Sequence, residues 1–499
     1  MRARLKVDPE RVIGRIDRNI FGQFMSRRPG CSEDGLYAPD SPTADAYGIR
    51  RDVSQALADL KPSVIRWPGG STGASYHWLD GVGPVGGRPK KIDLSFGWPT
   101  RHEFGTHEFI TWCRRIGAEP HLNFAMGTGT LEEAAAWLEY CNSPLDTNFA
   151  NLRRKHGQDA PYAVKYWQLG NEMYGTWELG YCKPGDYAAQ AREWAKILRK
   201  VDPSIKLLAV GGDGDDNDGQ WAWEVVPEVA RYVDYVAFHT YWGSPGPAGS
   251  DPWYQLLAGP HRAERKIEQL AAIIETVELT QRARRRGLRI ACTEWNTTPG
   301  FSSTGGQSGL GTFQPRYHLH DALAVATFAN IMQRHCRQIT LATIAQSINV
   351  VGLVVVDEQG MVLEPTYWAW RLATNYGGSL AVDTWVEGET FACPERRLAD
   401  LPYLDASASL EPDTGRLYLS LVNRHLTEPI DLEVRLTDAS VVAGGLAHML
   451  YHDDPQAMNS HDQPENVRAR TEPVALDGSR FTHELPPHSY TVLELPLTR

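Results

Sequence analysis

Two glutamates stand where buried-looking runs of residues turn polar. The run KYWQLGNE (165–172) ends on Glu172, and the run RIACTEWN (289–296) carries Glu294 near its end. Two carboxyl groups that face each other can cleave a glycosidic bond, because one donates a proton to the leaving oxygen while the other attacks the anomeric carbon. In the retaining form of this chemistry the two groups lie about 5–5.5 Å apart. The pair therefore predicts a hydrolytic site, provided that the fold brings the two runs together.

The two acids need different protonation states. The proton donor must hold its proton near neutral pH, and we expect partial burial and the charge of Glu294 to raise the pKa of Glu172. The nucleophile must stay ionised. Arg66, in the run SVIRWPGG (63–70), is a cation that would keep Glu294 in that form.

An alternating pattern of apolar runs and helical stretches, from residue 17 to residue 377, would place these side chains in one cleft. Eight β-branched or apolar runs occur at residues 19–25, 63–70, 120–127, 165–172, 205–212, 235–242, 289–296 and 339–349. Stretches typical of helices lie between or after them, at residues 50–61, 106–117, 131–141, 184–201, 261–287, 317–336 and 365–376. Eight such units predict an α/β fold, a (β/α)8 barrel, whose active site lies at the C-terminal ends of the strands.

Further polar side chains stand at the ends of these predicted strands and would meet the two acids at the rim of the barrel. They are Arg66, Asn171, His239, Tyr241 and Gln346. The residues alone leave other interpretations open, since Arg66 would also suit a structural ion pair and His239 a hydrogen-bonded core position.

The pattern changes after residue 377. Runs with a period of two occur at residues 416–425, 430–436, 447–452, 473–476 and 489–497, separated by turn residues, and predict an antiparallel β-sandwich. The N-terminal run RARLKVD (2–8) precedes the barrel and is expected to pair into that sandwich. We therefore divide the chain into a barrel, residues 17–377, and a sandwich domain made of residues 1–16 plus 378–499.

Composition argues against several kinds of partner. The formal net charge of -11 disfavours nucleic acid, because phosphate binding needs a basic surface. No apolar run is long enough to span a bilayer, and the charged N-terminal residues 1–14 do not resemble a secretory signal. Seven widely spaced cysteines without a CxxC pair favour free thiols in a reducing cytoplasm over disulfides or a zinc site.

Two stretches resemble metal-binding segments but have simpler explanations. DGDDNDGQWAWE (213–224) matches positions one, three, five and twelve of a calcium loop, yet it lacks the glycine at position six. We expect a solvated loop or a helix cap there, with cation binding left open. RYHLHD (316–321) offers two histidines with no third ligand in view, which favours a polar surface.

Combined, the motifs are specific. Over nearly its whole length the sequence resembles glycoside hydrolase family 51, the intracellular α-L-arabinofuranosidases, through GLYAPDSP, VIRWPGG, YHWLDGVGP, FGTHEF, MGTGTLEEA, WQLGNEM, VDYVAFHTY, TEWN and AQSINV. The resemblance implies a barrel with a C-terminal sandwich and a retaining, exo-acting hydrolase of an oligosaccharide or glycoside. It implies no cofactor and no metal, and it suggests a cytoplasmic homo-oligomer, often a hexamer.

The resemblance also implies roles for single residues. Glu172 would be the general acid/base and Glu294 the nucleophile. Asn171 would bind the sugar 2-hydroxyl. The remaining pocket residues would be Tyr241 and Arg66, which hold the nucleophile, together with His239 and Gln346.

Three motifs depart from the family pattern. The family has Glu-His after the first strand, where this chain has Ser26 and Arg27, and that glutamate grips the terminal hydroxymethyl group of arabinose. The asparagine that follows RWPGG in the family is Ser71 here, at another position that contacts the sugar. The family's GNEMDGPWQ reads GNEMYGTWE, with Tyr174 and Glu178. The catalytic residues are kept, whereas the part of the site that meets the far end of the sugar is rebuilt.

These departures raise the question of the substrate. β-D-Galactofuranose matches α-L-arabinofuranose around the ring and carries one more hydroxylated carbon, for which Ser26 would leave room. Loss of a charged hydrogen bond to arabinose would cost about 1.5–3 kcal/mol. The same motifs would also suit an endo-glucanase of this family, and the fold would suit a catalytically weak carbohydrate-binding protein. A metal-dependent barrel hydrolase would differ from all of these in its sensitivity to chelators.

Overall fold

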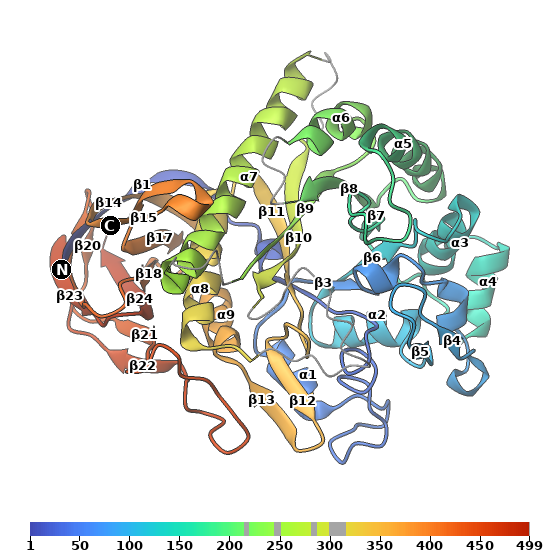
Figure 1. The fold of residues 1–499 in the computed structure, drawn as a ribbon, viewed down its shortest axis with the longest axis horizontal. Helices are drawn as coiled ribbons and strands as arrows, with labels where there is room; N and C mark the ends of the chain where they lie inside the picture. The colour runs from blue at the N-terminus through green and yellow to red at the C-terminus, as the bar shows by residue number, and fades with distance from the viewer. Residues whose placement is uncertain (214–218, 244–250, 281–286, 299–315, 499) are drawn as a thin grey trace.

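A closed barrel of eight parallel strands forms the larger part of the protein (Figure 1). The computed structural model describes residues 1–213, 219–243, 251–280, 287–298 and 316–498. The barrel strands in chain order are β2 (Gly22–Phe24), β3 (Val64–Trp67), β6 (Glu119–Phe124), β7 (Tyr166–Leu169), β8 (Lys206–Asp213), β9 (Tyr235–Trp242), β10 (Arg289–Thr297) and β11 (Ile339–Ala345). All eight strands predicted from the sequence are present, and the predicted barrel is confirmed.

Helices follow the strands and cover the outside of the barrel (Figure 1). They are α1 (Arg51–Ala58), α2 (Thr106–Arg115), α3 (Leu131–Asn142), α4 (Asn148–Lys155), α5 (Pro184–Val201), α6 (Gln220–Val229), α7 (Pro252–Thr280), α8 (Leu319–Arg334) and α9 (Pro365–Asn375). Helices α4 and α6 were not predicted from the sequence, and α7 begins nine residues earlier than predicted. Among the described residues of the calcium-like stretch, Gln220–Glu224 lie in α6, and residues 214–218 lie outside the described part.

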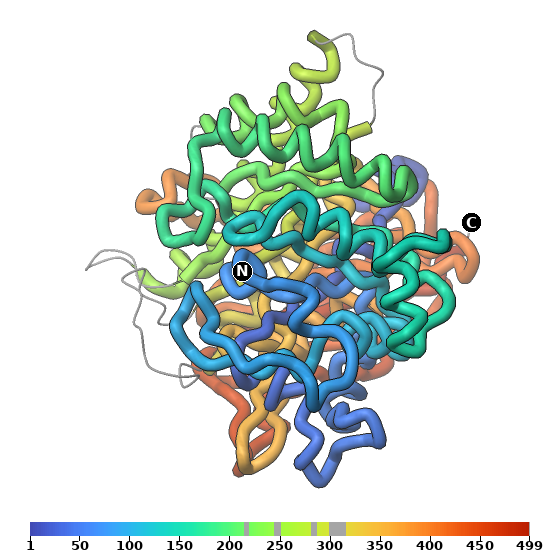
Figure 2. The backbone as a smooth tube through the Cα atoms, turned by 90° about the vertical axis from the view of Figure 1, so that its right-hand side faces the viewer, coloured from blue at the N-terminus to red at the C-terminus, as the bar shows by residue number. Residues whose placement is uncertain are grey.

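The apolar runs become strands because both of their faces are covered. Every residue of β3 and of β7 is buried, as expected for a parallel sheet between a filled barrel interior and a layer of helices. Figure 2 turns the N-terminal and middle parts of the barrel toward the viewer, with the helices outermost. The polar residues at the carboxyl ends of the strands therefore share one rim.

The C-terminal residues form a ten-stranded sheet that also includes the N-terminal strand. Its strands are β1 (Arg2–Arg15), β14 (Leu380–Gly388), β17 (Leu404–Glu411), β18 (Arg416–Asn423), β19 (Ile430–Leu436), β20 (Ser440–Val441), β21 (Leu446–Leu450), β22 (Arg470–Pro473), β23 (Arg480–Leu485) and β24 (Ser489–Thr498). The sheet curls over one apolar core, since strands as far apart in its order as β18 and β19 share the same cluster of buried side chains. The predicted β-sandwich is confirmed.

The N-terminal strand pairs as expected, since β1 runs antiparallel to β14 and parallel to β19. Strands β14, β17 and β23 were not predicted from the sequence. The strand predicted at residues 473–476 lies too late in the chain, because β22 already ends at Pro473.

Helix α8 joins the barrel to the sheet (Figure 1). Asn330 Nδ2 and Arg334 Nη2 both contact the buried carboxylate of Asp405 on β17, at 2.8 Å and 3.1 Å. Because α8 donates polar contacts to the sheet while its apolar residues pack on the barrel, it fixes the orientation of the two domains.

Small elements complete the described chain. The hairpins are β4 (Lys91–Ile92) with β5 (Pro99–Thr100), β12 (Val354–Asp357) with β13 (Gly360–Leu363), and β15 (Thr390–Cys393) with β16 (Leu398–Pro402). The short 3-10 helices are η1 (Arg18–Phe21), η2 (Ser71–Gly73), η3 (Trp78–Gly81), η4 (Val85–Gly87) and η5 (Pro394–Arg396). Within the described residues, every helix is too short or too polar to cross a bilayer.

Candidate active site

The carboxylate of Glu294, on β10, is held from both sides. Its Oε1 accepts a hydrogen bond from Arg66 Nη1 at 2.6 Å, and its Oε2 accepts one from the Tyr241 hydroxyl at 2.7 Å. Burial, and then the charge of Glu294, raise the pKa of Tyr241, so the phenol is the donor. These two contacts fix the position of the carboxylate.

Arg66 itself is completely buried on β3. Its other Nη donates to Asn171 Oδ1 at 2.7 Å, and its guanidinium lies 4.8 Å above the ring of Phe24. A buried cation of this kind is stable only while its carboxylate partner is present. Arg66 and Glu294 therefore depend on each other for folding as well as for the shape of the site.

Glu172 follows β7 in a tight turn. Gly170 has a positive φ of 80°, which suits a residue without a side chain, and Glu172 itself has a φ of 41°. A non-glycine residue in this region costs about 1–3 kcal/mol, and such positions cluster at functional sites. The turn puts the Asn171 and Glu172 side chains on the same rim as β9 and β10.

The carboxylate of Glu172 has two donors of its own. His239 Nδ1 lies 2.9 Å from Oε1, and the Trp177 indole N–H donates to Oε2 at 2.8 Å. Burial alone would raise the pKa of Glu172, but the contacts with His239 and Trp177 outweigh it, and the pKa lies below its usual value. The prediction of a raised pKa is therefore wrong for this arrangement, because it left out donors from β9 and the β7 loop.

The two glutamates and His239 form one cluster. One oxygen of each carboxylate and one ring nitrogen of His239 all lie within 4.8 Å of one another. His239 Nε2 lies 2.9 Å from Thr293 Oγ1, so the residue before Glu294 helps to orient the imidazole. The fold of the barrel thus brings together two glutamates that are more than a hundred residues apart in the sequence.

The predicted sugar-contact residues fall into two groups around this cluster. Ser71 donates a hydrogen bond to Glu178, and Asn171 Nδ2 donates to the same carboxyl oxygen at 3.0 Å. Ser26 instead donates to Gln346 Oε1 at 2.7 Å. All nine residues proposed from the sequence therefore lie on one rim, although Ser26 and Gln346 bond to each other and not to any of the three glutamates.

Three residues that contact this site were not predicted as site residues: Trp177, Glu178 and Thr293. Glu178 stood out in the sequence as a departure from the family pattern, without a role. Burial and the charge of Glu172 raise the pKa of Glu178 to about 8. The closeness of Glu178 to Glu172 in the sequence was a signal that could have found it, but the orientation of its carboxyl group depends on the loop.

Two groups of described residues have the donors to hold a metal ion. One is the cluster of Glu172, His239 and Glu294. The other is His318 and His320 with Asp321, whose Oδ2 lies 3.5 Å from His320 Nε2 and 3.8 Å from His318 Nδ1. The expectation that no third ligand is near the two histidines is therefore wrong. That carboxylate oxygen already accepts the backbone N–H of His318 at 2.9 Å as the cap of α8.

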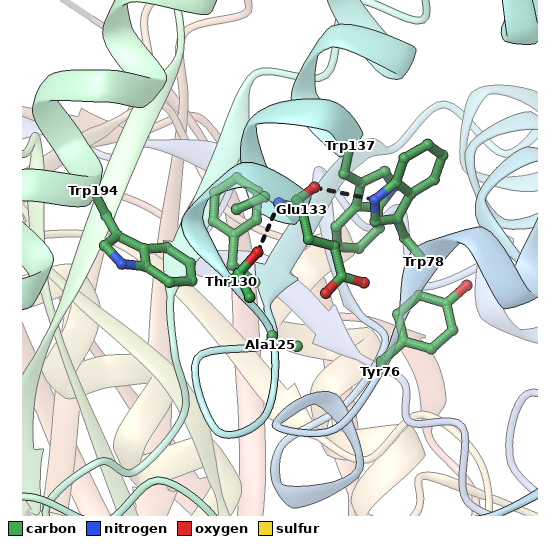
Figure 3. Close-up of a pocket in the computed structure, with 10 residues that line it drawn as sticks. Tyr76, Trp78, Ala125, Thr130, Glu133, Trp137 and Trp194 are labelled. Carbon is green, nitrogen blue, oxygen red and sulfur yellow. Dashed lines mark hydrogen bonds between the residues drawn. The ribbon is translucent and has the colours of Figure 1, made fainter. Parts of the chain in front are cut away.

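A separate cavity lies between α3, α5 and the end of β6 (Figure 3). Its walls are mostly aromatic and include Trp78, Trp137 and Trp194, and the Trp78 indole donates to the backbone oxygen of Glu133 at 3.1 Å. The cavity has a volume of about 10 Å³, close to the minimum for one water molecule. It is too small for a sugar, and none of the nine predicted site residues lines it.

Comparison with known proteins gives one consistent family. Residues 56–253 match the α-L-arabinofuranosidase 1 domain, and residues 293–489 match the α-L-arabinofuranosidase C-terminal domain. The α-L-arabinofuranosidase C of Emericella nidulans is 35% identical over 449 residues, 86% of each chain. The intracellular exo-α-(1→5)-L-arabinofuranosidase 1 of Bacillus subtilis is 29% identical over 99% of each. The thermostable GH51 α-L-arabinofuranosidase from Thermotoga petrophila RKU-1 superimposes with a TM-score of 0.90, at 33% identity and 99% coverage of each chain.

Proposed function

Since this chain belongs to glycoside hydrolase family 51, the family of the α-L-arabinofuranosidases, we propose that it releases terminal α-L-arabinofuranosyl residues from oligosaccharides or glycosides. The observation that carries the proposal is the approach of the Glu172 and Glu294 carboxylates to within 4.8 Å. Inverting enzymes need about 6.5–9.5 Å between the two groups to admit a water molecule, whereas retaining enzymes use about 5–5.5 Å. The short separation favours double displacement with net retention.

In the first step, Glu294 attacks the anomeric carbon while Glu172 donates its proton to the departing glycosidic oxygen. The bond to the leaving group breaks as the bond to the Glu294 carboxylate forms. In the second step, Glu172 takes a proton from water, whose oxygen then displaces Glu294. Arg66 and Tyr241 stabilise the Glu294 carboxylate when it leaves, because both donate to it in the resting protein.

The lowered pKa of Glu172 suits the second step, in which it acts as a base. The first step needs the protonated acid. A glycosidic oxygen that takes the place of the Trp177 or His239 contact would remove a donor from the carboxylate and exclude water, and both changes raise the pKa of Glu172. We propose that substrate binding itself converts Glu172 from base to acid.

Roles for the remaining residues follow from their contacts. Asn171 presents its amide next to Glu172, and His239 orients the acid. We propose that Ser26, Gln346 and Ser71 line the part of the pocket that meets the far end of the sugar.

Room beside Glu294 depends on Gly70, in the loop after β3. A Cβ atom at this position would lie 2.6 Å from Glu294 Oε1 and 3.4 Å from Asn171 Nδ2. We expect Gly70→Ala to push the carboxylate aside and lower kcat/KM by about 100-fold, since a small misplacement of a reacting group has effects of this size. Steady-state kinetics on a 4-nitrophenyl α-L-arabinofuranoside measures the effect.

Gly86→Ala is the matched control, because a Cβ at Gly86 meets no atom within 4 Å. It should leave kcat/KM and the melting temperature unchanged. Wild-type kinetics in Gly70→Ala would contradict the proposed position of the nucleophile.

Ser26 and Ser71 bear on which furanoside the enzyme hydrolyses. The hydroxyl of Ser26 is already bonded to Gln346, and its short side chain favours one second candidate, β-D-galactofuranoside. We expect kcat/KM for 4-nitrophenyl α-L-arabinofuranoside to exceed that for 4-nitrophenyl β-D-galactofuranoside by at least about tenfold, a difference of about 1.4 kcal/mol. The reverse order would favour the galactofuranoside. Hydrolysis of neither would favour the binding-protein interpretation.

The cellular setting is also a proposal. We infer that the enzyme acts in the cytoplasm, supported by seven cysteines that are all free and by an intracellular relative in Bacillus subtilis. We further propose a homo-oligomer, with the hexamer as the first state to test, and a division into the barrel, residues 17–377, and the sandwich domain, residues 1–16 plus 378–499. Light scattering of the purified protein measures the oligomeric state, and limited proteolysis tests the boundaries.

A further inference from the structure

Glu178 is a third carboxyl group at this site. It lies in the loop between β7 and α5 and is only 6% exposed. Its Oε1 accepts hydrogen bonds from the Ser71 hydroxyl and from Asn171 Nδ2. Its Oε2 is buried and has no hydrogen-bond partner among the described residues. Oε1 therefore has hydrogen-bond partners, whereas Oε2 has none among the described residues.

The proton of Glu178 belongs on the unpartnered oxygen. Burial, followed by the negative charge of Glu172, raises the pKa of Glu178 to about 8, so the neutral acid prevails at neutral pH. Two donors converge on Oε1, which must then act as the carbonyl oxygen, and this leaves the hydrogen on Oε2. A buried O–H group without an acceptor is unfavourable, and a ligand that supplies an acceptor relieves it.

Glu178 is also connected to the predicted nucleophile. Asn171 bonds to Glu178 through its Nδ2 and to Arg66 through its Oδ1, and Arg66 in turn holds Glu294. Asn171 and Glu294 both lie beside Gly70, because a Cβ atom placed at this glycine would contact both side chains. Gly70 itself has no side chain to separate them. The carboxyl of Glu178, the Asn171 amide and the carboxylate of Glu294 thus follow one another along one polar wall of the site.

We propose that Glu178 is a specificity-determining residue that, as a neutral carboxylic acid, donates its Oε2 hydrogen to a hydroxyl group of the bound furanose. The inference rests on the proposed function, because it takes the ligand to be a sugar. A sugar hydroxyl is a suitable partner because it accepts one hydrogen bond and still donates another. Ionised Glu178 would lose the hydrogen that it donates and add a third negative charge next to Glu172 and Glu294.

A pH profile separates this role from simple packing. The substrate is 2,4-dinitrophenyl α-L-arabinofuranoside, whose leaving group departs without a proton, so titration of Glu172 does not limit kcat/KM. We expect wild-type kcat/KM to be maintained below pH 8 and to fall as pH rises through about 8, because the raised pKa keeps Glu178 neutral only below that value. In Glu178→Gln this fall should be absent, since the amide does not titrate.

The amide of Glu178→Gln can reproduce the native contacts, with its oxygen accepting from Ser71 and Asn171 and its N–H₂ donating to the sugar. At pH 6 we expect its kcat/KM to stay within about tenfold of wild type, and that of Glu178→Ala to fall by about 10- to 100-fold. Melting temperatures of all three proteins check folding. If wild type and Glu178→Gln show the same alkaline fall, the inference is overturned.

Deoxygenated substrates identify the hydroxyl group. Removing the hydroxyl at C2, C3 or C5 should weaken kcat/KM in wild type, and for one position this loss should disappear in the Glu178→Ala background, as in a double-mutant cycle. Additive losses at all three positions would overturn the proposal. Failure of the wild-type enzyme to hydrolyse any arabinofuranoside would instead contradict the proposed function, so the two failures are distinct.

Discussion

Replacing Glu294 by alanine should lower kcat/KM for aryl α-L-arabinofuranosides by about 10⁵-fold, the order observed when a nucleophile is removed from an enzyme. The proposed first step requires a carboxylate at this position, where Arg66 and Tyr241 each hold one of its oxygens. Initial rates with the 2,4-dinitrophenyl glycoside provide the measurement. Added azide, small enough for the vacated space, should attack in place of the carboxylate and give the glycosyl azide of inverted configuration.

The same change removes the partner of a buried cation. Leaving Arg66 without its carboxylate costs about 3–5 kcal/mol, so the loss of activity must be separated from a loss of folding. Glu294→Gln keeps a hydrogen-bond acceptor for Arg66 without a nucleophilic carboxylate. It should be as inactive as the alanine variant while it melts closer to wild type. Substantial activity in a folded Glu294→Gln would exclude this residue as the nucleophile.

Replacing Glu172 by alanine should produce a loss that depends on the leaving group. For alkyl or oligosaccharide leaving groups, which need a proton, we expect kcat/KM to fall by about 10²- to 10⁴-fold, the usual contribution of a general acid. For the 2,4-dinitrophenyl glycoside, kcat/KM should change little, and kcat should fall because the second step loses its base. Parallel kinetics on the two classes of substrate measures the difference.

Azide provides the decisive contrast between the two glutamates. In Glu172→Ala, azide enters on the face from which water attacks, so it should restore kcat and give the glycosyl azide of retained configuration. Glu294→Ala should give the opposite anomer. Trp385→Phe is a suitable control for unaltered kinetics, because Trp385 is 64% exposed and lies on the sheet domain, away from the site. An equal loss of activity for good and poor leaving groups would argue against an acid/base role for Glu172.

The elements that were missed show where local pattern fails as a guide. Helix α4 reads NFANLRRK and is only eight residues long, so its few apolar residues are too short a series to reveal a helical period. Strand β17 reads LDASASLE, in which alanine and serine replace the β-branched residues that mark a strand. Helix α6 follows a run of aspartates and glycines, which disguises its start, and it contains Pro227, a residue that disfavours a helix. Each of these segments is stabilised by its neighbours more than by its own composition.

The alternation of strands and helices, and with it the barrel, could be predicted from the chain alone, because hydrophobic periodicity is a local property. The same pattern placed Glu172, Glu294 and Arg66 at strand ends on one rim. How these groups are paired and protonated depends instead on the folded arrangement. The pKa of Glu172 is set by burial, which raises it, and by the contacts with His239 and Trp177, which lower it further than burial raises it, and that of Glu178 by burial beside Glu172. Such distances arise when the barrel closes, because electrostatic interactions act between groups that are close in space and far apart in sequence.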